Sequence, residues 1–126
     1  MKRKVNSDYT MRHYNSLVNN LGETNYINYK WFRDEITIHE YNQTKIALIS
    51  DLERRSNFIN ILEVGCGPGV WTTLLAQKCK RLVAVDISEA MLKQAKKNVS
   101  DNNVTLICAD FLNWPLKFVE FDAIYA

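Results

Sequence analysis

Residues 57–72 read N-F-I-N-I-L-E-V-G-C-G-P-G-V-W-T, and this stretch decides the fold. Its first half, from Phe58 to Val64, is apolar apart from Asn60 and Glu63 and rich in β-branched residues, which predicts a short buried strand. A glycine-rich run and then a helical pattern follow without a gap. Strand, glycine turn and helix in this order predict a β-α unit whose helix-start N–H groups face a ligand.

The spacing of the glycines differs from that of dinucleotide-binding sites. Gly65, Gly67 and Gly69 are spaced G-x-G-x-G with Glu63 two residues upstream, whereas the dinucleotide-binding fingerprint is G-x-G-x-x-G. The glycines permit a tight turn and a close approach of ligand to backbone. A strand-to-helix turn without any ligand would show the same local pattern, so the downstream residues must decide between these interpretations.

Two acidic residues follow the next two predicted strands. Asp86 lies 21 residues after Gly65 and ends the apolar run Leu82 to Val85, where a carboxylate can accept hydrogen bonds from both ribose hydroxyls of an adenosine. Asp110-Phe111 leaves the end of a third strand and offers an acceptor and an aromatic face. Taken singly, Asp86 is also a good helix-entry residue, and Asp110-Phe111 also fits a turn Asp beside a core Phe.

Residues 61–126 together resemble the class I S-adenosylmethionine-dependent methyltransferases, nearest to the small-molecule enzymes of the ubiquinone and menaquinone type. The resemblance rests on E-x-G-x-G-x-G at the turn, on Asp86, on Asp110-Phe111, and on F-D-A-I-Y-A at 121–126, which is similar to the family's fourth strand. It implies S-adenosylmethionine as cofactor. A nicotinamide dinucleotide would need neither the turn spacing nor an acidic residue at the adenine edge.

The resemblance also implies which residues contact the cofactor. The turn would bind the methionine moiety through backbone groups, with Glu63 near its amino group; Asp110 would accept from the adenine amino group, and Phe111 would pack on the ring. The implied cofactor-binding residues are Glu63, Gly65, Cys66, Gly67, Gly69, Asp86, Ile87, Asp110, Phe111 and Ala126.

No catalytic residue is nominated, because the cofactor carries the reactive sulfonium and the protein need only position an acceptor and exclude water. His13 and His39 could act as a base, although a surface or core role is the usual one for such residues. Tyr14, Tyr29 and Trp31 could line the pocket, with core packing as the alternative.

The remaining elements follow from periodicity and capping signals. Before the glycine turn we expect a helix capped by Ser7 or Asp8 with Gly22 just after its end, a polar connection at 23–30 and a helix at about 36–54. After the turn we expect a helix to about Lys80 and another at 89–99 that is capped by Ser88. The further strands are expected at 82–85, at 104–108 and from 121, with a loop or broken helix at 112–120.

These elements predict an α/β fold. We expect a partial Rossmann-like parallel sheet with strand order 3-2-1-4, helices on both faces and an amino-terminal helical cap. The cap would span residues 1–56, and the cofactor-binding half-domain would span residues 57–126.

The composition of the chain restricts the kinds of partner that we expect it to bind. The net charge is +2 and, although residues 1–4 are basic, no basic tail or stripe occurs, which argues against a nucleic-acid or membrane surface and for a small-molecule methyl acceptor. Three cysteines without a C-x-x-C pair favour a reduced, cytoplasmic protein with no metal site. No apolar run approaches the 18 or so residues of a membrane span.

The family fold has seven strands in the order 3-2-1-4-5-7-6, whereas this chain supplies four. We therefore expect a fragment, or a chain that self-associates or pairs with another polypeptide through the exposed edge of the fourth strand. The alternatives to a small-molecule methyltransferase are a non-catalytic cofactor-binding or interaction fragment and, less favoured, a nucleic-acid methyltransferase or an NAD-binding oxidoreductase.

Overall fold

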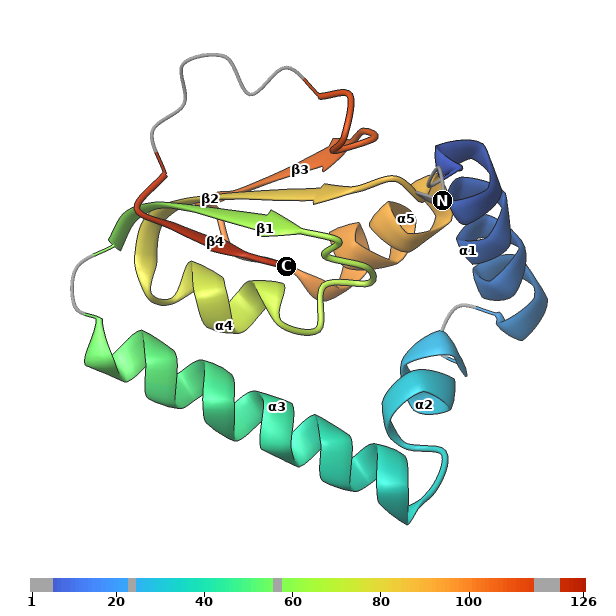
Figure 1. Cartoon of the computed structure of the whole chain (residues 1–126), viewed down its shortest axis with the longest axis horizontal. Helices are drawn as coiled ribbons and strands as arrows, with labels where there is room; N and C mark the ends of the chain where they lie inside the picture. The colour runs from blue at the N-terminus through green and yellow to red at the C-terminus, as the bar shows by residue number, and fades with distance from the viewer. Residues whose placement is uncertain (1–5, 23–24, 56–57, 115–120) are drawn as a thin grey trace, which may run out of the picture.

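The computed structural model describes residues 6–22, 25–55, 58–114 and 121–126 (Figure 1). Five helices and four strands occur in these residues, and the bounds are α1 Ser7–Leu21, α2 Asn25–Trp31, α3 Glu35–Arg54, β1 Phe58–Val64, α4 Thr72–Ala76, β2 Cys79–Asp86, α5 Glu89–Asn98, β3 Val104–Cys108 and β4 Ala123–Tyr125.

The four strands form one sheet in the order β3-β2-β1-β4, and every pairing is parallel. Ile61 of β1 lies between Leu82 of β2 and Ala123 of β4. The predicted Rossmann-like topology is thus confirmed. All carboxyl ends of the strands meet at one edge of the sheet, which is where such folds place their sites.

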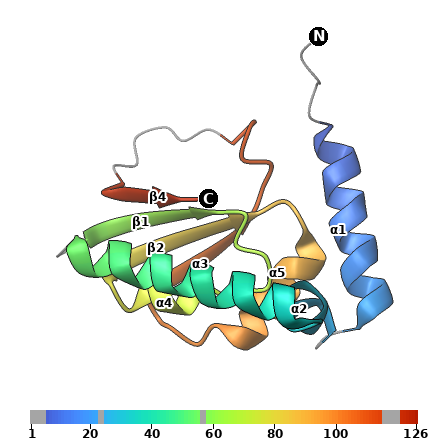
Figure 2. The same ribbon diagram turned by 60° about the horizontal axis from the view of Figure 1, so that its bottom comes forward.

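One face of the sheet packs against helices. Ile61, Leu82 and Ala123 form a buried cluster with Leu52 of α3 and Leu75 of α4, and a neighbouring cluster joins Ala84 of β2 to Leu92 of α5. Figures 1 and 2 show α3, α4 and α5 on this side of the sheet.

The opposite face is covered differently. Leu62, Val83 and Val85 are buried there against side chains of the β3–β4 connection, which include Phe111, Trp114 and Phe121. No described helix contributes to this cluster. The prediction of helices on both faces is therefore wrong for the described residues, because side chains of a connection, and not a helix, bury these strand residues.

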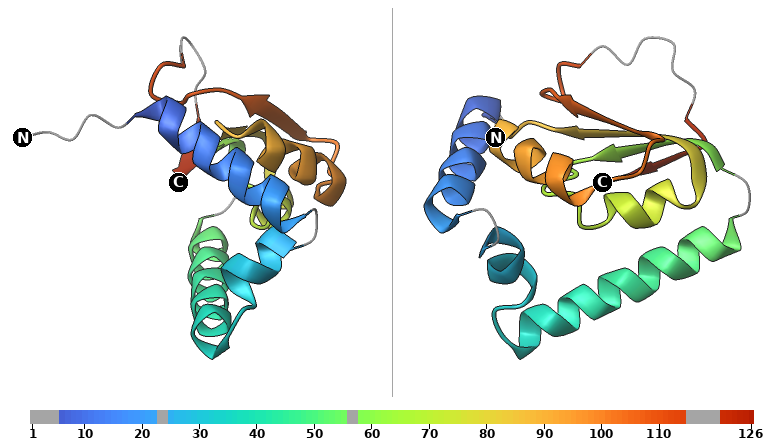
Figure 3. Two further views of the ribbon diagram at one scale, coloured as in Figure 1. Left: turned by 90° about the vertical axis from the view of Figure 1, so that its right-hand side faces the viewer. Right: turned by 180° about the vertical axis from the view of Figure 1, so that it is seen from behind.

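The first two helices stand at the carboxyl edge of the sheet (Figure 3). Val18 of α1, Tyr26 of α2 and Met91 of α5 form a small buried cluster that holds α1 and α2 against α5. The sequence predicts a polar connection at 23–30, but Asn25–Trp31 form the helix α2, in which Tyr26 is buried. The predicted division of the chain at residue 56 stays a prediction, since residues 56–57 lie outside the described residues.

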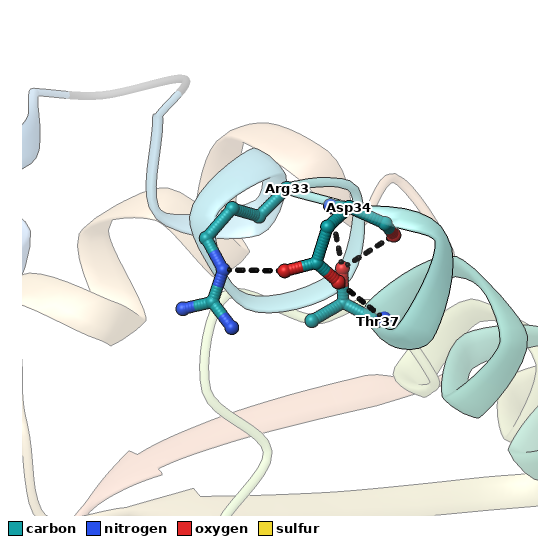
Figure 4. A network of polar contacts seen from close by, with 3 residues as sticks. All are labelled: Arg33, Asp34 and Thr37. Carbon is teal, nitrogen blue, oxygen red and sulfur yellow. Dashed lines mark hydrogen bonds and ion pairs between the residues drawn. The ribbon is translucent and has the colours of Figure 1, made fainter.

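Capping fixes where the first and third helices begin. The side chain of Asn6 caps α1 by accepting from the Tyr9 N–H at 3.2 Å, so the prediction of Ser7 or Asp8 was wrong by one or two residues. Gly22 ends α1 with φ 78°, as predicted. At the start of α3, Asp34 and Thr37 form a reciprocal capping box, and Arg33 pairs with the Asp34 carboxylate at 3.0 Å (Figure 4).

Two predicted element boundaries differ from those in the structure. The helix after the glycine turn ends at Ala76 and not near Lys80, because Cys79 and Arg81 pair with Phe58 and Asn60 and extend β2. The fourth strand begins at Ala123 and not at Phe121. Of the predicted loop at 112–120, the described residues Leu112–Trp114 form turns, and the rest lies outside the described residues.

Candidate functional site

A cavity of about 320 Å³ opens at the carboxyl edge of the sheet. Its floor consists of the ends of β1, β2 and β3 with the segments that follow them, and its roof comes from α1 and α2. The lining residues are Ser7, Thr10, Tyr14, Tyr26, Val64, Gly65, Gly67, Val85, Asp86, Ile87, Met91, Ala109, Asp110, Phe111 and Leu112. Its volume lies in the range of small-molecule sites.

The glycine turn is tied to the neighbouring strand. The N–H groups of Gly65 and Cys66 donate to the Val85 carbonyl at 2.7 and 3.1 Å. Gly67 has φ 53°, and a Cβ added there would meet nothing within 4 Å, so the left-handed backbone and not crowding requires glycine. Gly69 also has positive φ, but an added Cβ would lie 2.7 Å from Val99 Cγ2. Gly67 thus faces the cavity, whereas Gly69 lets the turn pack on α5.

Asp86 is the charged centre of the floor. Its carboxylate accepts from the Gly67 N–H and from the Ser88 N–H, each at 2.8 Å. Burial raises the pKa of this carboxyl, and the hydrogen bonds from backbone N–H groups partly oppose that effect. A carboxylate can accept about four hydrogen bonds, so acceptor capacity remains for a ligand.

Asp110 and Phe111 form the end of the cavity beyond β3. The Asp110 carboxylate accepts from the Leu112 N–H at 3.1 Å and from the Asn113 amide. Its pKa lies below the ordinary value because hydrogen bonds, first from Ser7, favour the charged form. The Phe111 ring lies 6.4 Å from the Trp114 ring and joins the buried cluster on the loop-covered face.

Glu63 and Cys66 lie behind the cavity. Glu63 is 5% exposed, and its carboxylate accepts from the Thr72 hydroxyl at 2.8 Å. Burial raises its pKa to about 7; the Thr72 hydrogen bond opposes this and the charge of Asp86 adds to it. Cys66 is buried beside Ala84, and burial raises the pKa of its thiol.

The structure brings six of the ten predicted cofactor-binding residues to the cavity: Gly65, Gly67, Asp86, Ile87, Asp110 and Phe111. Glu63, Cys66 and Gly69 belong to the layer behind it, and Ala126 follows β4 without lining it. The binding roles of all ten stay predictions.

The roof is the part that sequence reasoning missed. Ser7, Thr10 and Tyr14 of α1 and Tyr26 of α2 line the cavity, and of these only Tyr14 was a candidate. A usable signal was present, because positions 7, 10 and 14 continue the stripe of Leu17, Val18 and Leu21 and change it from apolar to hydroxyl-bearing.

The other aromatic and histidine candidates do not line the cavity. Trp31 packs against Tyr41 and Trp71, with ring centroids 5.9 and 5.5 Å apart. Tyr29 lies outside the lining, and so do the exposed His13 and His39. Among the described residues, no helix is long and apolar enough to cross a bilayer, and no three His, Cys, Asp or Glu side chains gather as metal ligands would.

The fold and the cavity define a Rossmann-like α/β domain with an acidic, hydroxyl-roofed cleft at the carboxyl edge of its sheet. The sequence model of the family described as "Methyltransferase domain" matches residues 61–126, just over half of the chain. The chain belongs to this family, as the sequence predicted.

Relatives in sequence agree with that assignment, and a solved structure shares the fold. Malonyl-[acyl-carrier protein] O-methyltransferase of Priestia megaterium is 46% identical over 61 residues, which are 44% of this chain and 22% of that protein. Ribosomal RNA small subunit methyltransferase A of Mycoplasmopsis pulmonis is 32% identical over 83 residues, 66% of this chain and 31% of that protein. The DhpI–SAH complex structure superposes with a TM-score of 0.69 at 20% identity and covers 94% of this chain and 51% of its own. The chain thus spans about half or less of the length of these three proteins.

Proposed function

We propose that this chain forms the S-adenosylmethionine-binding part of a methyltransferase that acts on a small molecule. The observation that carries the proposal is the grouping, around one cavity, of the glycine turn at Gly65 and Gly67, the Asp86 carboxylate and the Asp110-Phe111 pair. Membership of the methyltransferase domain family supports it.

The residues present fit such a cofactor. Asp86 offers acceptor oxygens to the ribose hydroxyls, Ile87 and Phe111 offer apolar surface to the adenine ring, and the positive-φ turn leaves room beside Gly67. When bound, the cofactor supplies a methyl group on a sulfonium. The protein then contributes binding, orientation and the exclusion of water, for which the roof of α1 and α2 is suited.

The first test is a calorimetric titration of the chain with S-adenosylhomocysteine and, separately, with NAD. We expect binding of S-adenosylhomocysteine alone, and binding of NAD alone would reverse the assignment. Asp86→Ala should weaken the affinity by about two to four orders of magnitude, since two charge-assisted hydrogen bonds of roughly 1.5–3 kcal/mol each are lost. Asp101→Asn, in the turn before β3 and outside the cavity lining, is the matched control.

The acceptor is proposed to be small because the net charge is only +2 and no run of basic residues is longer than Lys2-Arg3-Lys4. The match to a ribosomal RNA methyltransferase makes RNA methylation the second candidate. Incubation with radiolabelled cofactor and either quinol precursors, amines or ribosomal RNA separates the two. Label in RNA would contradict the small-molecule proposal.

We also propose that turnover needs additional protein surface. Within the described residues β4 pairs with β1 alone, and Ile124 beside that edge is 60% exposed. The expected result is cofactor binding with weak or no turnover by the chain, together with self-association in size-exclusion chromatography. A monomer with ordinary turnover would show that this proposal is wrong.

A further inference from the structure

The roof helix α1 contacts the start of α5 through one polar side chain. The side-chain amide oxygen of Asn15 accepts from the Ser88 hydroxyl at 2.6 Å and from the Ala90 N–H at 3.2 Å. Asn15 is 73 and 75 residues away from these partners in sequence. Ser88 is fully buried, so its hydroxyl depends on this acceptor in place of water.

The contact gives α5 a second cap that comes from another helix. The first N–H groups of a helix lack partners within it. Ser88 satisfies the Met91 N–H at 3.2 Å in the usual way, and Asn15 satisfies the Ala90 N–H. Since these donors point along the helix axis, the position of Asn15 relative to α5 is directionally restricted.

The same residues lead to the floor of the cavity. The Ser88 N–H donates to one oxygen of Asp86 at 2.8 Å, and the Gly67 N–H donates to the other at 2.8 Å. A continuous series of hydrogen-bonded residues therefore joins the roof helix to the glycine turn, in the order Asn15, Ser88, Asp86 and Gly67.

Asn15 lies between the part of α1 that lines the cavity and the part that packs against α5. Ser7, Thr10 and Tyr14 on its amino-terminal side line the cavity, whereas Val18 on its carboxyl-terminal side packs into the apolar cluster with Met91. Apolar packing is not directional, so Val18 alone leaves the rotation and tilt of the amino-terminal half open. Asn15 supplies a directional contact between α1 and the start of α5, and the hydrogen bond between Ser7 and Asp110 supplies another at the cavity itself.

We propose that Asn15 is a positioning residue that holds the roof helix α1 in a fixed position over the cavity. It thereby couples closure of the roof to the binding of a ligand at Asp86. The proposal rests on the proposed function, because it assigns the ligand of that site to the cavity beneath α1. A ligand that contacts both Asp86 and the roof hydroxyls then binds more tightly when α1 is already held in place.

The test compares Asn15→Ala, which removes the acceptor, with Asn15→Asp, which keeps an acceptor oxygen and places a favourable charge at a helix start. Asn19→Ala, an exposed position one turn further along α1, is the matched control. Three quantities are measured for each: the dissociation constant for S-adenosylhomocysteine, the unfolding midpoint, and the amide hydrogen exchange of α1 with and without that ligand.

We expect Asn15→Ala to weaken binding about tenfold, the size expected for a lost hydrogen bond and an unpaired buried hydroxyl. Its α1 amides should exchange faster and lose their protection by ligand, while amides of β1 and β2 stay unchanged. Asn15→Asp should restore both affinity and protection, and Asn19→Ala should match the wild type. Wild-type affinity and wild-type α1 exchange in Asn15→Ala would overturn the proposal, and so would a loss that Asn15→Asp does not restore.

The exchange measurement without ligand separates this proposal from the proposed function. If the wild-type chain binds no S-adenosylhomocysteine, the proposed function fails, and faster α1 exchange in ligand-free Asn15→Ala still supports the contact as the determinant of roof position. If the wild type binds but α1 exchange is the same in both proteins, the positioning role fails and the cofactor assignment stands.

Discussion

The two faces of the sheet bury similar strand residues under different covers. On one face, Leu82 packs beneath α3 and α4; on the other, Leu62 packs beneath Phe111 and Trp114 of the β3–β4 connection. Both leucines are fully buried. The helix-covered face also holds the buried carboxylate of Glu63, whereas the loop-covered face leaves Ile124 60% exposed. Equal burial therefore need not mean equal rigidity, because a helix layer adjusts less readily than the side chains of a connection.

The sharpest test of this difference is a matched pair of core truncations. Leu82→Ala should lower the free energy of unfolding by about 4–5 kcal/mol and Leu62→Ala by about 2–3 kcal/mol, because the cost of a cavity depends on how far its surroundings collapse. Urea unfolding at one pH measures both. Equal losses would mean that the two covers are equally rigid.

The buried carboxylate should give the helix-covered face a pH dependence. Glu63 has its pKa raised from 4.5 to about 7, so the folded state binds a proton that the unfolded state has released between these values. Its stabilising contribution is complete below pH 4.5 and is lost as the pH rises through 7. The loss is on the order of 3 kcal/mol.

Glu63→Gln isolates that contribution, because the amide oxygen can still accept from Thr72 but does not titrate. The difference in unfolding free energy between variant and wild type should grow in favour of the variant from pH 4.5 to pH 8. Glu53→Gln, exposed on α3, is the control for replacing a glutamate by a glutamine. A pH-independent difference at position 63 would contradict the raised pKa.

A smaller gain in stability is expected within the helix layer. Gln94 of α5 is 4% exposed, and neither its amide nitrogen nor its amide oxygen has a hydrogen-bond partner among the described residues. Gln94→Leu should raise the free energy of unfolding by about 1–3 kcal/mol, since it removes the cost of burying an unpaired amide. Thermal unfolding measures the change, and the exposed Gln77→Leu should move it little. A loss at position 94 would mean that its amide has a partner in solution.

The smallest change in stability is expected on the loop-covered face. Ile124→Thr should alter the free energy of unfolding by less than about 0.5 kcal/mol, because the side chain is mostly exposed and threonine also suits a strand. The same variant should reduce self-association in size-exclusion chromatography if this face contacts another chain. A large loss of stability would show that Ile124 is buried in the isolated chain.

The sequence predicted those parts of the fold whose signals are local. The strand β1 and the helix α5 occur almost as expected, because an apolar β-branched run specifies one and the Ser88 cap specifies the other. The helix α2 was missed because its asparagines and tyrosines carry no helical stripe, and Tyr26 becomes buried only against α1 and α5. Tertiary packing, not propensity, forms this helix.

The candidate site likewise has a part that the sequence predicts well and a part that it predicts poorly. The floor residues Asp86 and Asp110 were predictable since each follows an apolar strand, and parallel strands bring such ends together. The roof residues Ser7 and Thr10 have only a weaker signal, the hydroxyl-bearing continuation of the apolar stripe of α1. Their place over the cavity depends on contacts between Asn15 and residues more than 70 positions away. No local pattern encodes a contact of that range.

The central position of β1 has a consequence for the order in which the sheet assembles. Phe58 pairs with Cys79 across a short β-α-β segment, whereas the Asp122 carboxylate that accepts from the Ile59 N–H at 2.7 Å lies 63 residues away. Closing the longer loop costs more chain entropy, and β4 has only three residues with which to offset it. We therefore expect β1 and β2 to pair early in refolding and β4 to join last. Pulsed hydrogen exchange should then protect the Gly65 amide, which follows β1 and donates to the Val85 carbonyl of β2, before the Asp122 amide, which donates to the Asn60 carbonyl.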